Sequence, residues 1–142
     1  MNPVKVDVVE KKKKTILTEL KILAEIQRRH QSGQGDPILE HALSHAMQNC
    51  ISAIIDISQH IAADKLPAPP ESYSEAIVAL GTIGVLDLSF AEDFSRVAKL
   101  RNVLVHLYDN VDHNFLFSLI PNLIRDSKKF VKLVSEFVKL SP

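Results

Sequence analysis

Residues 46–61, AMQNCISAIIDISQHI, decide the fold class of this chain. They lie in a longer run that begins at Asp36, a favourable N-cap residue, and Pro37, whose missing N–H suits a first helical turn. The run continues to about Ala63. Its apolar residues are Leu39, Leu43, Ala46, Met47, Cys50, Ile51, Ile54, Ile55, Ile57 and Ile61. These positions cover more than one helical stripe, so the sequence predicts a helix with neighbours on two sides, one of which can belong to a second subunit.

Outward from this helix, strand patterns are almost absent and apolar periodicity predicts further helices. The predicted helices are residues 8–29, about 36–63, 71–80, 89–105 and a long last helix after residue 112. In the first, the apolar stripe is Ile16, Leu17, Leu20, Leu23 and Ala24. Ser72 caps the third, Gly81 and Gly84 interrupt it, and Pro121 kinks or interrupts the last. The sum predicts one all-α domain over residues 1–142, with two long antiparallel helices and about three others.

Composition excludes several classes of protein. Seventeen basic residues balance seventeen acidic ones, which argues against a protein that coats nucleic acid through bulk charge. The single cysteine, Cys50, excludes an internal disulfide framework, fits a reducing cytoplasm and is expected to be a buried, inert thiol. No secretory signal is visible, and no stretch approaches the ~18 apolar residues of a membrane span. We therefore expect a cytoplasmic protein that does not insert into a membrane.

Polar chemistry is concentrated in residues 101–108, RNVLVHLY. Arg101 offers a planar fork of donors for phosphate, and His106 can move protons near neutral pH. Asn102 can orient either partner. Together these side chains can cleave or bind a phosphodiester without a metal, and a 2′-hydroxyl nucleophile would confine cleavage to RNA. The structural alternative is a basic residue that complements a helix dipole, followed by a tyrosine, Tyr108, that closes the edge of a core.

Helical angles constrain this motif. Arg101 and Tyr108 are seven positions apart, so a continuous helix brings them within roughly 20° of one face. Arg101 and His106 are five positions apart, and these two diverge by about 140°. They converge only if the helix unwinds near His106 or if a symmetry mate supplies one of them. We therefore predict a twofold homodimer with both motifs close to the interface.

The motif also carries a family resemblance. Arg101, His106 and Tyr108 match the R-x4-H-x-Y motif of HepT, a branch of the HEPN helical superfamily. Residues 46–61 resemble that family's second helix, and residues 70–73 and 84–86 resemble the connection to its motif helix. The resemblance covers roughly residues 17–137.

This resemblance implies a function. HepT proteins are toxins of two-gene toxin–antitoxin systems, and typically metal-independent endoribonucleases that act as homodimers without a cofactor. The resemblance implies that Arg101 and His106 carry RNA cleavage and that Asn102 supports it. It also implies a partner, a nucleotidyltransferase antitoxin of the MntA type, which transfers AMP to Tyr108. The added negative charge beside Arg101 would block RNA.

Other polar residues leave alternatives open. Asp56, among apolar neighbours, is either a carboxylate that orients Arg101 or His106, or an exposed or capping one. His41 and His45 are four apart but lack a third ligand, so we predict no metal site. A competing function is a non-catalytic helical subunit that binds RNA or a nucleotide, or that acts as a scaffold for a nucleotidyltransferase. Growth arrest on expression without the partner separates a toxin from a scaffold.

Overall fold

Six helices make up most of the chain that the computed structural model describes, residues 6–106 and 112–140. They are α1 (Val6–Gln31), α2 (Pro37–Lys65), α3 (Tyr73–Ile83), α4 (Leu88–Phe94), α5 (Val97–His106) and α6 (His113–Leu140). No strand occurs in these two ranges. The predicted all-α bundle is confirmed, with three long helices and three short ones instead of two and three.

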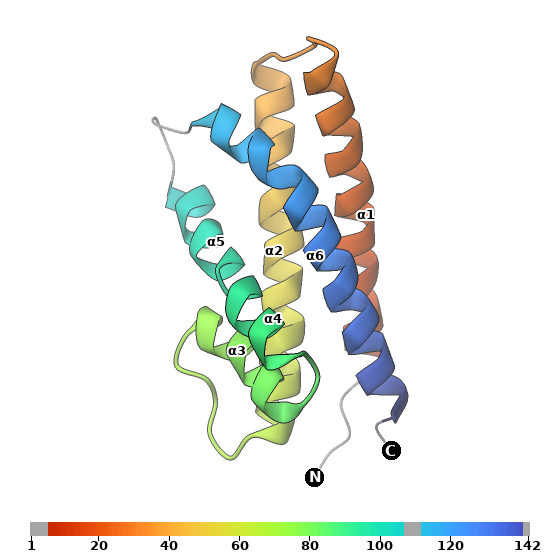
Figure 1. Ribbon diagram of the computed structural model, residues 1–142, viewed down its shortest axis with the longest axis vertical. Helices are drawn as coiled ribbons and strands as arrows, with labels where there is room; N and C mark the ends of the chain where they lie inside the picture. Colours follow the sequence, from red (N-terminus) through yellow and green to blue (C-terminus); the bar gives the residue numbers. More distant parts are fainter. Residues whose placement is uncertain (1–5, 107–111, 141–142) are drawn as a thin grey trace.

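Helix α2 is the centre of the bundle. It packs against α1, α3, α5 and α6; in Figure 1, α1 runs beside it, α6 crosses in front, and α3 to α5 lie on the other side. Each of its ten predicted apolar positions is at most 6% exposed. The helices that cover them belong to the same chain. The prediction of neighbours on two sides is confirmed, but these ten positions offer no surface to a second subunit.

Two helices begin as their sequences predict. Asp36 accepts a hydrogen bond from the Leu39 backbone N–H at 2.8 Å at the start of α2. Ser72 accepts one from the Glu75 N–H at 3.1 Å at the start of α3, and the Glu75 carboxylate accepts one from the Glu71 N–H at 2.9 Å. Each cap contributes about 1 kcal/mol and fixes the residue at which its helix begins. For α3, that first residue is Tyr73.

The prediction that Gly81 interrupts the third helix is wrong. Gly81 lies inside α3, which ends at Gly84 in the left-handed conformation with φ 97°. A Cβ atom on Gly81 would lie 2.9 Å from the Ala91 Cβ and 3.1 Å from the Leu88 Cδ1. The glycine therefore permits the close packing of α3 against α4, which no pattern within α3 alone reveals.

The predicted helix over residues 89–105 is two helices. The α4 helix ends at Phe94 and α5 begins at Val97. Between them, the Arg96 N–H donates to the Asp93 carbonyl and the Ala98 N–H to the Ser95 carbonyl, which are bonds of a tighter turn than an α-helix. The break makes α5 a separate segment of ten residues, oriented by its own contacts with α2 and α3.

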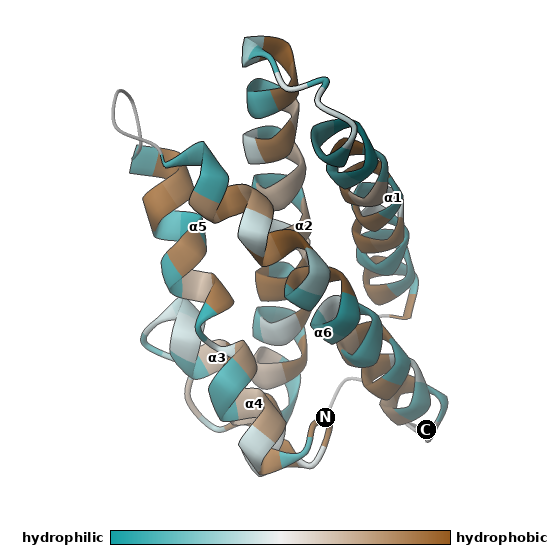
Figure 2. Ribbon diagram, turned by 45° about the horizontal axis from the view of Figure 1, so that its top comes forward, coloured by the Kyte–Doolittle hydropathy of each residue, from teal (hydrophilic) through white to brown (hydrophobic). Residues whose placement is uncertain are grey.

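The two outer long helices differ from their predictions in detail. Of the two predicted effects of Pro121, the interruption is wrong, because α6 is continuous through it. The first turns of α6 bend away from the rest in Figure 1, in agreement with the predicted kink. In α1, Leu17 and Ala24 are exposed, whereas the other three predicted stripe residues are buried. Hydrophobic and hydrophilic residues alternate along both helices in Figure 2, as expected for helices with one buried side.

Cys50 is buried in α2, as predicted. Its Sγ lies 3.9 Å from the Ser127 Oγ of α6, and burial raises the pKa of the thiol to about 12. The thiolate is therefore scarce at neutral pH.

Across the described ranges, none of the helices combines the length and the apolar character that crossing a membrane requires.

Candidate functional site

The predicted catalytic residues lie on α5. Ala98 and Leu104 are buried and anchor this helix, while Arg101 is half-buried and Asn102 and His106 are exposed. His106 is the last residue of α5, with regular helix on its N-terminal side. Tyr108 lies outside the described residues, so its predicted place beside Arg101 stays a prediction.

Arg101 and His106 do not converge within one chain. The described backbone is helical from residue 97 to residue 106, so the unwinding that would bring the two together before His106 is not present. Five helical steps direct the side chains about 140° apart. His106 lies within about 60° of Val103, whereas Arg101 points to the opposite side, toward α3.

Arg101 is held by an aromatic ring. Its guanidinium carbon lies 5.1 Å from the centroid of the Tyr73 ring, at the first residue of α3. This distance is within the range of a cation–π contact. No carboxylate of residues 6–106 or 112–140 forms an ion pair with Arg101. Neither Tyr73 nor its contact was part of the predicted site.

A second contact fixes the end of α5. Gln48, half-buried on α2, donates a hydrogen bond from Nε2 to the Leu104 carbonyl at 3.1 Å. The last carbonyls of a helix have no partner within the helix, and Gln48 supplies one for a carbonyl two residues before His106. The apolar pattern of α2 predicted how this helix packs, but nothing in the sequence marked Gln48 as a partner of α5.

We expect Gln48→Leu to lower the free energy of unfolding by about 1 kcal/mol, because a part-buried carbonyl loses its donor. Urea denaturation measures the change. Gln59→Leu is the matched control, since Gln59 is exposed on the same helix, and it should stay within about 0.5 kcal/mol of the parent. Equal losses in both variants would show that the Leu104 bond contributes nothing.

Asp56 has a different partner from the predicted ones. Its carboxylate forms an ion pair with Lys12 of α1 at 2.9 Å, and the side chain is 45% exposed. It contacts neither Arg101 nor His106 in the described chain, which leaves the exposed alternative from the sequence as the better description. The pair joins α1 to α2.

The other histidines are engaged separately. His45 lies 3.0 Å from the Asn49 amide, one turn along α2. His113 pairs with Glu40 at 2.6 Å, and the His30 ring stacks on Phe117 at 3.7 Å. In the described ranges, no three or more side chains of His, Cys, Asp or Glu gather where they could hold a metal ion.

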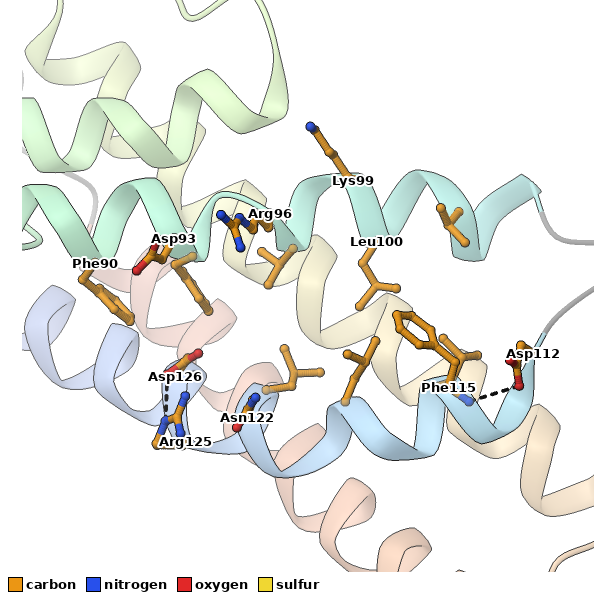
Figure 3. A pocket seen from close by; sticks show the side chains of 16 residues that line it. Phe90, Asp93, Arg96, Lys99, Leu100, Asp112, Phe115, Asn122, Arg125 and Asp126 are labelled. Carbon is orange, nitrogen blue, oxygen red and sulfur yellow. Dashed lines mark hydrogen bonds and ion pairs between the residues drawn. The ribbon is translucent and has the colours of Figure 1, made fainter.

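A groove separates α4 and α5 from α6 beside the motif. It has a volume of about 980 Å³, and Figure 3 shows the side chains that line it. Its apolar lining residues are Phe90, Phe94, Val97, Leu100, Val103, Phe115, Leu116, Leu119 and Leu123. Two of them are largely open to solvent, Val103 at 49% and Phe115 at 54%. Three acidic and three basic side chains also line it, namely Asp93, Asp112, Asp126, Arg96, Lys99 and Arg125.

Known proteins share this sequence pattern. The family model described as "Ribonuclease HepT-like" matches residues 16–134. The tRNA nuclease HepT of Aphanizomenon flos-aquae is 28% identical over 92 residues, which cover 65% of this chain and 63% of that protein. The match thus spans less than two thirds of that relative's length. A putative RNase of Archaeoglobus fulgidus is 27% identical over 107 residues, 75% of this chain and 80% of that protein.

Solved structures share the fold. A tri-AMPylated Shewanella oneidensis HEPN toxin, in complex with an MNT antitoxin, superposes with a TM-score of 0.81 at 20% identity, over 96% of this chain and 99% of that one. YutE of Bacillus subtilis, described as a cytosolic protein of unknown function, gives 0.82 at 21% identity, over 100% and 97%. At these identities the likeness establishes the HEPN fold alone. The family model, however, covers most of the chain, including its R-x4-H motif, and this chain belongs to the HepT-like family.

Proposed function

We propose that this protein is the toxin of a two-gene toxin–antitoxin system, an endoribonuclease that cleaves RNA without a metal and acts in the cytoplasm. One observation carries the proposal: in a HepT-like chain, the motif arginine keeps its donors unpaired by carboxylate while the motif histidine is exposed at the end of the same helix. A relative matched over part of its length is a tRNA nuclease, so tRNA is the first substrate to test. Cleavage of tRNA by the purified protein in EDTA is the test.

The chemistry follows from the residue types. Arg101 binds the scissile phosphate and stabilises the charge that develops on it. His106 takes the proton from the ribose 2′-hydroxyl, whose oxygen forms the new bond to phosphorus as the bond to the 5′-oxygen breaks. The departing 5′-oxygen takes a proton from water, the proton on His106 neutralises the hydroxide left behind, and the products are a 2′,3′-cyclic phosphate and a 5′-hydroxyl. Asn102, exposed next to Arg101, would orient the RNA.

A second copy of this chain completes the site in our proposal. Arg101 and His106 of one chain face different directions, so a facing side chain has to come from a symmetry mate. The groove lies on the Val103 side of α5, the side that His106 is near, and offers a surface to the second copy, because Val103 and Phe115 are exposed there. Its three acidic and three basic side chains suit a twofold contact, in which the same patch meets itself.

We expect light scattering to give twice the mass of one chain at micromolar concentration. Phe115→Asp should convert the protein to a monomer, because a carboxylate buried without a partner at an interface is costly. Leu17→Asp is the control, since Leu17 is also exposed, at 41%, but lies on α1 away from the groove. A monomeric parent protein, or a Phe115→Asp variant that remains dimeric, would contradict this assembly.

The proposed regulation acts at Tyr108. A nucleotidyltransferase antitoxin of the MntA type would transfer AMP to its hydroxyl, two residues beyond His106. The HEPN toxin of Shewanella oneidensis is tri-AMPylated and bound to an MNT antitoxin. That likeness lends support, and the motif tyrosine of this chain supplies the acceptor. Each AMP adds a phosphodiester charge close to where RNA phosphate would bind.

A further inference from the structure

The face of the Tyr73 ring contacts the Arg101 guanidinium, whose carbon lies 5.1 Å from the ring centroid. A carboxylate partner would hold an arginine by occupying its N–H donors. An aromatic face holds it differently, because the ring attracts the cation as a whole and offers no carboxylate oxygen to its N–H donors. Such a contact fixes the cation without competing with phosphate.

The start of α3 fixes the position of the Tyr73 ring. Tyr73 is the first residue of α3, where the Ser72 cap and the Glu75 carboxylate set the start of the helix. The prolines of residues 67–70 stiffen the segment that leads into it. At the other end of the contact, Arg101 is half-buried on α5, which packs against α3. Two anchored helices therefore define the position of one flexible arginine.

The Tyr73 hydroxyl is a separate group from the ring that contacts Arg101. Tyr73 is 38% exposed, and within residues 6–106 and 112–140 its hydroxyl makes no hydrogen bond to a protein group. The ring, not the hydroxyl, makes the contact with Arg101. A phenylalanine can replace it, whereas a leucine, which is apolar but has no ring, cannot.

We propose that Tyr73 is a positioning residue for RNA cleavage, which holds the Arg101 guanidinium so that its donors face the scissile phosphate. The inference rests on the proposed ribonuclease function for its effect on cleavage, but not for the contact itself. Tyr73 acts through Arg101 and need not touch RNA.

The experiment compares Tyr73→Leu with Tyr73→Phe on two readouts. The first is the Arg101 side-chain NMR signals, assigned by their disappearance in Arg101→Lys. A ring face shifts nearby protons, so these signals should move toward those of a free arginine in Tyr73→Leu and stay near the parent's in Tyr73→Phe. The second is tRNA cleavage, where Tyr73→Leu should lose about tenfold in kcat with little change in KM. Tyr73→Phe should stay within about twofold.

The outcomes separate this inference from the proposed function. Unmoved Arg101 signals in Tyr73→Leu overturn the positioning role, whatever the cleavage rate. Moved signals with an undiminished kcat also overturn it, as does a tenfold loss that Tyr73→Phe fails to rescue. If the parent protein does not cleave RNA, the proposed function fails, and the NMR comparison alone decides whether Tyr73 positions Arg101. Circular dichroism and thermal melting confirm that the variants keep the fold.

Discussion

His106→Ala is expected to lower the rate of tRNA cleavage in EDTA by roughly 10²- to 10⁴-fold, the usual contribution of a general acid–base group. Arg101→Ala is expected to lose at least as much, because a cation that stabilises developing phosphate charge is lost together with part of the binding. Both side chains lie outside the buried core, so circular dichroism should show unchanged helical content. Gel analysis of tRNA fragments measures the rates.

His41→Ala is the matched control for the histidine, since His41 is exposed on α2 and lies outside the motif. It should cleave like the parent protein. Parent-like cleavage by His106→Ala would remove the histidine from the mechanism. If the parent protein binds tRNA but leaves it intact, the non-catalytic binding or scaffold function becomes the better description.

Tyr108→Phe is expected to keep the toxin active and to make it resistant to its antitoxin. Phenylalanine lacks the hydroxyl that would accept AMP, so no negative charge is added beside Arg101. Cells that express this variant together with the proposed nucleotidyltransferase antitoxin should stop growing, whereas cells with the parent toxin and the antitoxin should grow. Intact-mass spectrometry of the co-expressed parent should show a gain of one or more AMP groups, and none for Tyr108→Phe.

Tyr73→Phe serves as the comparison variant, because it removes the hydroxyl of the other tyrosine in the chain. It should still be modified and neutralised. The same mass gain in Tyr108→Phe as in the parent would place the modification on another residue. If neither the parent protein nor Tyr108→Phe stops growth when expressed alone, the protein is not a toxin.

Local patterns predicted the fold because local physics specifies most of it. The apolar circumference of α2 reports a central helix, and Asp36 and Ser72 report where helices begin. The predictions were wrong where contacts with another segment determine the local structure. Within the sequence of α3 alone, Gly81 predicts a break in the helix. In the structure it lies inside the helix, where the absence of a Cβ lets α4 approach closely. The break at Ser95 and Arg96 likewise has no glycine or proline to mark it.

The candidate site was predictable in part for the same reason. Its motif residues follow one another in the sequence and could be recognised by spacing. Tyr73 and Gln48 contact the motif helix from positions 28 and 56 residues away from Arg101 and Leu104 in sequence, and only packing brings them there. For Asp56 the sequence suggested a contact that the structure lacks. Its apolar neighbours suggested a place near the motif, but its carboxylate pairs with Lys12.

The buried thiol of α2 gives this protein a built-in reporter of its own stability. Cys50 is the sole cysteine and is fully enclosed, so an alkylating reagent can reach it only when the bundle opens. When the bundle recloses faster than the reagent reacts, the rate of alkylation is proportional to the opening equilibrium constant. Pulse labelling under native conditions can rank every substitution discussed above by its opening equilibrium, without any introduced probe and without denaturant. Each activity measurement can thus be paired with a stability measurement on the same sample.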